Sequence, residues 1–370
     1  MCKRFIIFFV SMFFVNTLAF ADVNVVIMTP KEGRYEKLGA ELIKGTEIAV
    51  DDINNNGGLQ GERINLISID DPCDDTLSVS TAQMMAVNSS KDDKVSLVIG
   101  PYCSNSFEEI ADIYAKAKIF QIIPTTMGVN NYKHSHKGLV KLVGSKERQG
   151  KDFYNFSQEN YSDKMVAIIY DSNDRDIVDI AATIQAEFVK EKMSDRLKSF
   201  DYNRYKNADA LTDAVIESGA RLAYILGGSE KVTEAFRDLK EKNKNFVIFT
   251  NKYQLVDEYN EALGKIAEDS YMIALPSLTD NPSFTEELVK LRLLGIEPEG
   301  LSVYSYTAVK LWGDLVAKAK SFDYDKLAKE LETSKFETTW GEVMFNNGAP
   351  QDDINYGIYK VRSDHVEKVY

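Results

Sequence analysis

The chain has 370 residues, with 57 acidic and 44 basic side chains and a formal net charge of -13 at pH 7. An acidic balance of this size argues against nucleic acid and anionic membrane surfaces as partners, and it favours solubility. The length is sufficient for two domains, each with a core of its own.

Residues 1–21 have the organisation of a signal peptide. Lys3 and Arg4 form a positive start, residues 5–15 are apolar but too few to span a bilayer comfortably, and Ala19-Phe20-Ala21 is a small-x-small cleavage site. We therefore expect cleavage after Ala21 and export to an oxidising compartment, most simply a bacterial periplasm. No later segment has the long uncharged apolar run of a membrane helix, so no membrane insertion is expected after cleavage.

The three cysteines are informative because of where they lie. Cys2 falls in the signal and has no lipobox before it, whereas Cys73 and Cys103 belong to the exported part. Two cysteines in an exported chain predict one disulfide, which on the chain-entropy model stabilises the fold by about 3–4 kcal/mol. Cys103 also separates an apolar strand from small polar residues that open a helix, so the bridge would pin a strand-to-helix turn of the kind that binds small anions.

After the signal, short β-rich runs alternate with runs of helical period. The first series predicts strands at 23–28, 64–69, 95–99 and 120–123, and helices at 38–53, 77–87 and 107–117. After a break near Gly144 to Gly150, a second series predicts strands at 165–170, 196–200, 222–226 and 246–250, and helices at 177–189, 211–216 and 232–239. Two such series imply two parallel sheets with helices on both faces. Because ligands bind beyond the carboxyl ends of such strands, two facing lobes would form a cleft.

The tail has a different pattern. It predicts helices at 284–294, 303–319 and 325–331, followed by strands at 343–345 and 356–361 that are joined by a turn at Asn346 to Gly348. There is no long linker rich in proline or serine. The lobes are therefore expected to be joined by ordered crossovers.

The segment from Gly45 to Gly61, Gly-Thr-Glu-Ile-Ala-Val-Asp-Asp-Ile-Asn-Asn-Asn-Gly-Gly-Leu-Gln-Gly, resembles the helix-and-turn signature of type I periplasmic binding proteins. It is similar to the leucine/isoleucine/valine-binding branch that serves ABC importers, and residues 68–74, 98–106 and 122–126 continue in the same register. The resemblance implies two doubly wound, Rossmann-like α/β lobes joined by a three-crossover hinge. It places 22–144 plus 276–338 in the first lobe and 145–275 plus 339–370 in the second, with crossovers near 143–146, 273–277 and 338–341.

In the first lobe, the resemblance implies that a ligand carboxylate is held by a turn after the second cysteine and by small residues after the fourth strand. The matching residues are Ser104, Asn105, Thr125, Thr126 and Met127. A helix start at 104–106 would favour an anion on physical grounds alone, although its serines would also serve simply as caps. Met127 departs from the family, where a hydroxyl residue is usual.

The second lobe departs further from the family pattern. Arg175 and Ser229 stand where the family has aromatics, and Tyr253 stands where it has the acid that receives the ligand's ammonium group. Arg175 would offer a planar donor fork to a second carboxylate or a phosphate, unless it is a surface charge paired with a neighbouring aspartate. With a small shift of register, Asp174 or Glu230 would supply the missing negative charge.

Two motifs that suggest metal binding are interpreted otherwise. His134-x-His136 lies between lysines with no cysteine or carboxylate nearby, which indicates a surface loop. The aspartates around Cys73 lack the spacing of an EF-hand, and Asp74 or Asp75 is expected to cap the following helix. Neither a metal nor another cofactor is expected. Tyr35, Tyr102 and Tyr304 line the cleft or are ordinary half-buried tyrosines.

Three classes of function follow. The first is a monomeric binding protein that delivers a small carboxylate-bearing metabolite, an amino acid above all, to an inner-membrane ABC permease. The second is a sensor of the same fold, with a dicarboxylate or another ligand that lacks an amine. An enzyme is not expected, because both exported cysteines are oxidised and the three histidines lie in no recognisable catalytic setting.

Overall fold

The structure is a computed structural model of the chain. It describes residues 22–89, 94–103, 106–124, 137–142, 144–227, 229–251, 263–276, 285–295, 301–338, 340–351, 354, 356–362 and 366–370. The predicted signal peptide at 1–21 and the His134-x-His136 motif lie outside these residues.

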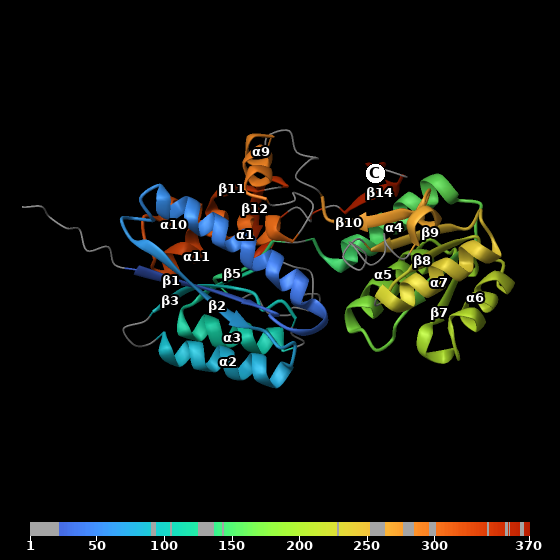
Figure 1. Cartoon of the computed structure of the whole chain (residues 1–370), viewed down its shortest axis with the longest axis horizontal. Coiled ribbons are helices and arrows are strands. Elements are labelled where there is room, and N and C mark those ends of the chain that lie inside the picture. The colour runs from blue at the N-terminus through green and yellow to red at the C-terminus, as the bar shows by residue number, and fades with distance from the viewer. Residues whose placement is uncertain are drawn as a thin grey trace, which may run out of the picture.

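Two parallel sheets organise the molecule into two lobes that lie side by side (Figure 1). The first sheet has five parallel strands in the order β2-β1-β3-β4-β5. Its strands are β1 (Asp22–Thr29), β2 (Arg63–Asp70), β3 (Val95–Ile99), β4 (Phe120–Ile123) and β5 (Leu139–Lys141). This arrangement confirms the expected fold class for the first lobe.

The second sheet has seven strands in the order β15-β14-β10-β9-β8-β6-β7. Its parallel part is β6 (Val166–Tyr170), β7 (Leu197–Asp201), β8 (Leu222–Ile225), β9 (Val247–Asn251) and β10 (Tyr271–Ala274). At the edge beyond β10, β14 (Gly357–Val361) and β15 (Val366–Lys368) join in antiparallel pairs. The end of the chain thus completes the second sheet.

Helices cover both faces of each sheet, as parallel strands require. In the first lobe, α1 (Glu36–Asn55), α10 (Ser302–Ala319) and α11 (Tyr324–Thr333) lie on one side, with α2 (Asp75–Asn88) and α3 (Phe107–Ala117) on the other (Figure 1). Successive side chains of β1 point to opposite faces of the sheet: Val25 and Ile27 pack with α1 and α10, whereas Val26 and Met28 pack with α2 and α3.

The second lobe repeats this division. Its sheet lies between α4 (Lys146–Tyr161) with α5 (Arg175–Lys190) on one side and α6 (Ala208–Glu217) with α7 (Ser229–Lys242) on the other. Ile168 packs into the core that contains α4 and α5, and the next residue, Ile169, packs into the core of α6 and α7. A further helix, α9 (Thr285–Leu293), lies on the first-lobe side.

The two lobes are tied together where the chain passes between them. The Tyr356 hydroxyl donates to the Gly144 carbonyl oxygen at 3.0 Å, and the Tyr356 N–H donates to Asp152 Oδ2 at 2.8 Å. A Cβ at Gly144 would lie 2.4 Å from the Ile354 carbonyl oxygen, so the two passing segments touch through their backbones. These contacts join the chain just before β14 to the segment at Gly144 and to α4.

Two expectations from the sequence are corrected here. The region around Gly150 is not a break between the two series, because α4 runs through it. A Cβ at Gly150 would lie 3.0 Å from side-chain atoms of Thr183, so the glycine allows α4 to pack closely on α5. The Asn347-Gly348 turn does not lead to β14. It joins β12 (Gly341–Asn346) to β13 (Ala349–Pro350), and β12 pairs with β11 (Lys335–Thr338), with Thr338 opposite Gly341.

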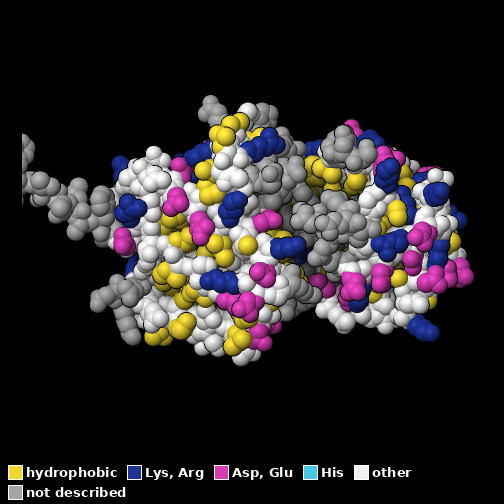
Figure 2. All heavy atoms as spheres, in the orientation of Figure 1, with side chains coloured by type: hydrophobic (Ala, Val, Ile, Leu, Met, Phe, Trp, Pro, Cys, Tyr) yellow, Lys and Arg dark blue, Asp and Glu magenta, His cyan; other side chains and the backbone are white. Residues whose placement is uncertain are grey.

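The distribution of surface charge and the hydropathy of the helices can be compared with the expectations from the sequence. On the face seen in Figure 2, acidic and basic side chains are interspersed over both lobes. Within the described residues, no helix combines the length and the hydropathy needed to cross a bilayer.

The contact between α1 and α10 yields a test of the first-lobe packing. A Cβ at Gly45 would lie 1.9 Å from the Ser302 carbonyl oxygen, so Gly45→Ala should lower the free energy of unfolding by about 1–3 kcal/mol through overpacking. Gly313→Ala on the same interface is the control. Its nearest neighbour is the flexible Ile53 Cδ1 at 3.2 Å, and the helix gains about 0.5–1 kcal/mol of propensity. Urea unfolding that ranks the two variants equally would contradict this packing.

Candidate functional site

The order of strands locates a crevice in each sheet. In both sheets, the chain leaves the first strand to one side and later returns to the other, which places a switch point between β1 and β3 and another between β6 and β8. Ligands of doubly wound sheets bind beyond the carboxyl ends of the strands at such points. The loops to consider are therefore those after β1, β3, β6 and β8.

In the first lobe, the loop after β3 is fastened to the loop after β2 by a disulfide. Cys73 and Cys103 are bonded to each other, with Cα atoms 5.1 Å apart and a sequence separation of 30. This confirms the predicted bridge. Cys103 is nearly buried, so the bridge lies partly beneath the surface of the lobe.

A buried carboxylate, which the sequence reading did not single out, reinforces this fastening. The Asp71 side chain is 0% exposed, and its Oδ2 accepts a hydrogen bond from the Cys103 N–H at 2.9 Å. Its Oδ1 accepts from the Ser78 hydroxyl at 2.9 Å and the Cys73 N–H at 3.2 Å. Burial raises the pKa of Asp71, while these donors and the backbone of Tyr102 act in the opposite direction.

Asp74 and the two cysteines also have structural roles in this region. Asp74 is the N-cap of α2, and its carboxylate accepts from the Leu77 N–H at 3.0 Å, as one of the two expected alternatives. Asp71, Cys73 and Cys103 bring potential metal-binding atoms within 4.8 Å of one another. Because the two sulfurs are bonded to each other, this group is a hydrogen-bonded disulfide rather than a set of ligands.

The tyrosines considered for the cleft are largely part of the packing. Tyr102 and Tyr304 are 5% and 6% exposed, and only Tyr35 is half-buried. The rings of Tyr35 and Tyr102 lie 5.7 Å apart, so they connect the loops on either side of the first switch point. Tyr304 stacks on Trp340 at 5.6 Å, a contact that the sequence did not predict.

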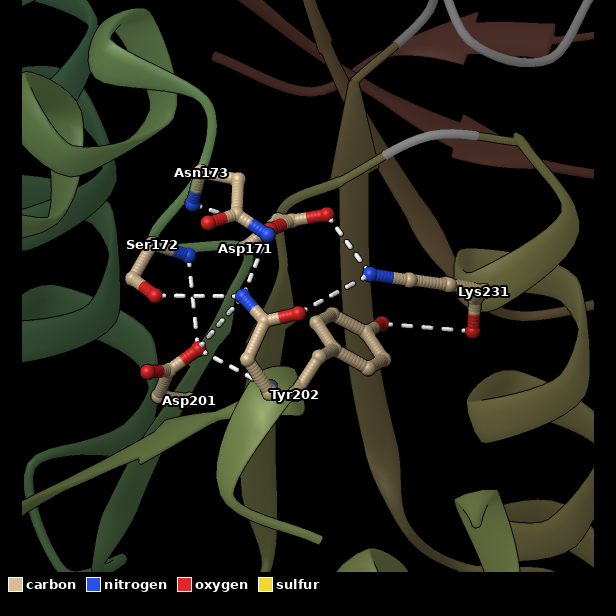
Figure 3. Close-up of polar contacts among 7 residues, drawn as sticks. Asp171, Ser172, Asn173, Asp201, Tyr202 and Lys231 are labelled. Carbon is tan, nitrogen blue, oxygen red and sulfur yellow. Dashed lines mark hydrogen bonds and ion pairs between the residues drawn. The ribbon is translucent and has the colours of Figure 1, made fainter. Parts of the chain in front are cut away.

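In the second lobe, polar side chains form a network at the carboxyl ends of β6 and β7 (Figure 3). Asp171 is its centre: Oδ2 pairs with Lys231 Nζ at 2.8 Å, and Oδ1 accepts from Asn203 Nδ2 at 2.8 Å and from the Asn173 N–H at 3.0 Å. Asp201 accepts from the Asn203 N–H at 3.0 Å. The network connects the loops after β6 and β7 with the first turn of α7.

The electrostatics of this network follow from its donors. Burial alone would raise the pKa of Asp171, but the hydrogen bonds from Lys231 and Asn203 outweigh it and lower the pKa. Burial acts on Asp201 in the same way and is outweighed by hydrogen bonds from Asn203 and Ser172, so its pKa is also lowered. Both carboxylates therefore remain ionised at neutral pH, and the charge of Asp171 is balanced by Lys231.

A second polar cluster holds the end of β9. Gln149 Nε2 donates to the Tyr224 hydroxyl oxygen and to Asn251 Oδ1, both at 2.6 Å, and the Tyr224 hydroxyl also donates to Asn251 Oδ1. Burial raises the pKa of Tyr224 well above its ordinary value, so the hydroxyl stays protonated. Asn251 is the last residue of β9, two positions before Tyr253, so this cluster fixes where the next loop begins.

The predicted ligand residues are placed only in part. Arg175 and Ser229 are the first residues of α5 and α7, the two helices that follow β6 and β8 on either side of the second switch point. Their side chains lie outside what the structure describes, as do the whole of Ser104, Asn105, Thr125, Thr126, Met127 and Tyr253. Ser106, considered as a cap, occupies the N-cap position of α3 but makes no side-chain capping hydrogen bond.

Two facing parallel-sheet lobes with a disulfide-fastened loop at one switch point define a type I binding-protein architecture. The model of the periplasmic binding protein family matches residues 22–365, and the chain belongs to this family. The family consists of solute-binding proteins rather than enzymes, as the sequence indicated.

The chain is similar to curated proteins of the predicted branch along most of its length. An amino acid binding protein of Pseudomonas aeruginosa is 25% identical over 349 residues, covering 93% of this chain and 91% of the relative. Leu/Ile/Val-binding protein homolog 1 of Brucella suis is 26% identical, covering 92% of this chain and 91% of the relative. The resemblance seen in the sequence is therefore confirmed.

Solved structures support the fold. The leucine-binding protein LivK of Thermotoga maritima has a TM-score of 0.79 at 19% identity and covers 94% of this chain and 98% of its own. The branched-chain amino acid binding protein LivJ of Streptococcus pneumoniae, in complex with isoleucine, has a TM-score of 0.75 at 18% identity and covers 94% and 99%.

The pair of Lys231 and Asp171 gives a pH-dependent test. The folded pKa of Asp171 is below its unfolded value, so its contribution to stability is present above about pH 3.9 and is lost as the pH falls through the folded pKa. Lys231→Met should lower the free energy of unfolding by about 0.5–1 kcal/mol at pH 7, because the pair is partly exposed. The difference from the unmodified protein should shrink as the pH falls below about 3.9.

Lys198→Met, at an exposed position of β7, is the matched control and should change little at either pH. Chemical unfolding of both variants at pH 7 and pH 3 makes the comparison. A Lys231→Met deficit that stays constant with pH would show that the loss is one of packing and not of charge.

Proposed function

We propose that this protein is an exported solute-binding protein that captures a small carboxylate-bearing metabolite in the cleft between its lobes and delivers it to an ABC importer. An amino acid is the leading class of ligand. The observation that carries the proposal is the similarity along more than nine-tenths of the chain to relatives described as amino acid and Leu/Ile/Val-binding proteins. The expected signal peptide supports a periplasmic location, and a monomer remains the expected state.

The lobes would act as two jaws around the ligand. We assign 22–144 and most of the segment from 276 to 350 to the first lobe, and 145–275 with the C-terminal strands to the second. The last boundary is moved from 338 towards 351–356 because β12 pairs with β11, and the Lys141 N–H of β5 donates to the Gly348 carbonyl oxygen at 2.7 Å. Ligand binding would shift the equilibrium towards a closed form, which the permease would recognise.

In the first lobe, the ligand carboxylate would bind at the turn leading into α3 and at the loop after β4. Ser104 and Asn105 would act with the positive end of the α3 dipole, and Thr125 and Thr126 would add hydroxyl groups. Met127 would contribute apolar surface. The support for this placement is that one segment follows β3, at the switch point, and the other follows β4, the neighbour of β3 in the sheet.

The second lobe would decide what else the ligand carries. Three of the predicted ligand residues come after neighbouring parallel strands, at the same edge of the sheet: Arg175 after β6, Ser229 after β8 and Tyr253 after β9. The charge of Asp171 is balanced by Lys231, which leaves it poorly suited to receive a ligand ammonium group. This observation favours a second candidate: a sensor or transporter subunit whose ligand is a dicarboxylate or another anion without an amine.

A thermal-shift screen of the refolded, ligand-stripped protein tests the proposal. Amino acids, amides, dicarboxylates and peptides form the panel, and a ligand at a hundredfold excess over Kd should stabilise the folded state by about 2.7 kcal/mol. A shift with neutral amino acids supports the leading function. A shift confined to anions without an amine favours the second candidate, and the absence of any shift would contradict both ligand classes.

Arg175→Ala separates the two ligand classes further. If Arg175 grips an anion, the variant should bind it well over tenfold more weakly, because the loss of a charged hydrogen-bond partner costs about 1.5–3 kcal/mol. Arg204→Ala is a suitable control, since Arg204 is a surface arginine of the same lobe whose side chain is 80% exposed. Isothermal titration with the ligand found in the screen gives both affinities, and equal values would dismiss a role for Arg175.

A further inference from the structure

We propose that Asp71 is a positioning residue for ligand binding: its buried carboxylate fixes the backbone of the turn at Cys103 from which the first-lobe ligand contacts arise. This inference rests on the proposed function, because it assumes that the segment from Cys103 to α3 meets the ligand. Asp71 itself would not touch the ligand, since its side chain is fully buried.

The carboxylate joins two loops that are far apart in sequence. It lies directly after the β2 strand and accepts hydrogen bonds from its own loop, through Cys73 and Ser78, and from the loop after β3, through the Cys103 N–H at 2.9 Å. The backbone of Tyr102 is also a donor to it. Asp71 thus holds two consecutive peptide groups of the β3 loop against the end of β2.

The disulfide alone does not hold the turn in this way. It joins the ends of two side chains, and each cysteine backbone can still rotate about its own Cα–Cβ bond. The hydrogen bond from the Cys103 N–H acts directly on the peptide plane between Tyr102 and Cys103 and fixes its orientation. The strength of a hydrogen bond falls steeply when its angle is poor, so a small rotation here would weaken every contact made by the next N–H groups.

The surroundings of Asp71 make its loss hard to compensate. Tyr114, whose pKa is raised by burial and by the charge of Asp71, is 1% exposed and lies on the same side of the sheet. With the carboxylate removed from such an enclosed place, the Cys103 N–H would lose its partner, and a buried unpaired donor costs free energy. The turn would then move to satisfy its backbone elsewhere.

The test compares Asp71→Ala and Asp71→Asn with three matched variants. Asp70→Asn changes an exposed neighbour, Cys73→Ser with Cys103→Ser removes the disulfide, and Val215→Ala weakens the core of the other lobe. Two properties are measured on the full exported protein: hydrogen exchange of the Cys103 amide, and the Kd for L-leucine and for succinate as probes. The exchange rate reports whether the turn at Cys103 is held in place, and the Kd reports whether ligand binding depends on that turn.

We expect Asp71→Ala to speed exchange at Cys103 and to weaken the probe that binds by at least tenfold each, with Asp71→Asn intermediate because one acceptor oxygen remains. The disulfide variant should retain most of the protection at Cys103. Val215→Ala should lower stability without changing either local property, which separates positioning from a general loss of structure.

Unchanged exchange at Cys103 in both Asp71 variants would overturn the proposal, and so would faster exchange with unchanged affinity. If the unmodified protein binds neither probe, it is the proposed function for these ligand classes that has failed, and exchange at Cys103 alone then decides the role of Asp71. If Asp71→Ala does not fold, Asp71→Asn carries the same comparison.

Discussion

The constraint on which the rest of this structure depends is the parallel pairing of strands in both lobes. Parallel strands cannot be joined by tight turns, so the chain must cross over through helices that bury both faces of each sheet. The same geometry sends the carboxyl ends of all parallel strands of a sheet to one edge. The loops that leave β1 and β3, or β6 and β8, are therefore brought together at that edge, although they are separate in sequence.

Buried strands that end at a common edge leave backbone and polar groups that need partners. In this protein, short carboxylates and amides supply them: Asp71 after β2, Asp171 after β6, Asp201 at the end of β7 and Asn251 at the end of β9. Each accepts hydrogen bonds from an element other than its own strand. This edge of each sheet is consequently supported by side chains whose hydrogen bonds join separate elements.

This support also bears on specificity. In the second lobe, the carboxylate at the end of β6 is neutralised by a lysine of α7, and its pKa is lowered by that contact. A ligand ammonium group would find little attraction there. Under the proposed function, the choice between an amino acid and a simple dicarboxylate therefore depends on the residues after β8 and β9, where the resemblance predicts a departure from the family pattern. Arg175, at the start of α5, adds a cation to the same edge.

The alternation of strands and helices, the pairing of Cys73 with Cys103 and the family were all predictable from the sequence. These depend on local periodicity and on the presence of only two exported cysteines. The helix α4 was not predicted, because Gly150 and the many polar residues of its sequence give no clear apolar period, although half of its residues are buried. The strand β12 was paired with the wrong strand, because a turn sequence indicates only the residues directly on either side of it. Ser104, Asn105, Thr125, Thr126, Met127 and Tyr253 stay predictions from resemblance.

Tertiary structure alone decided which polar residues meet. Asp71 stood among four aspartates around Cys73 and was not distinguishable from them, since only folding places it under the Cys103 amide. Lys231, Asn203 and Asp171 likewise come from three separate segments, and no local pattern marks them as partners. The physical reason is that hydrogen bonds and ion pairs depend on distances between segments, which the packing of helices on the sheets sets and the local sequence does not.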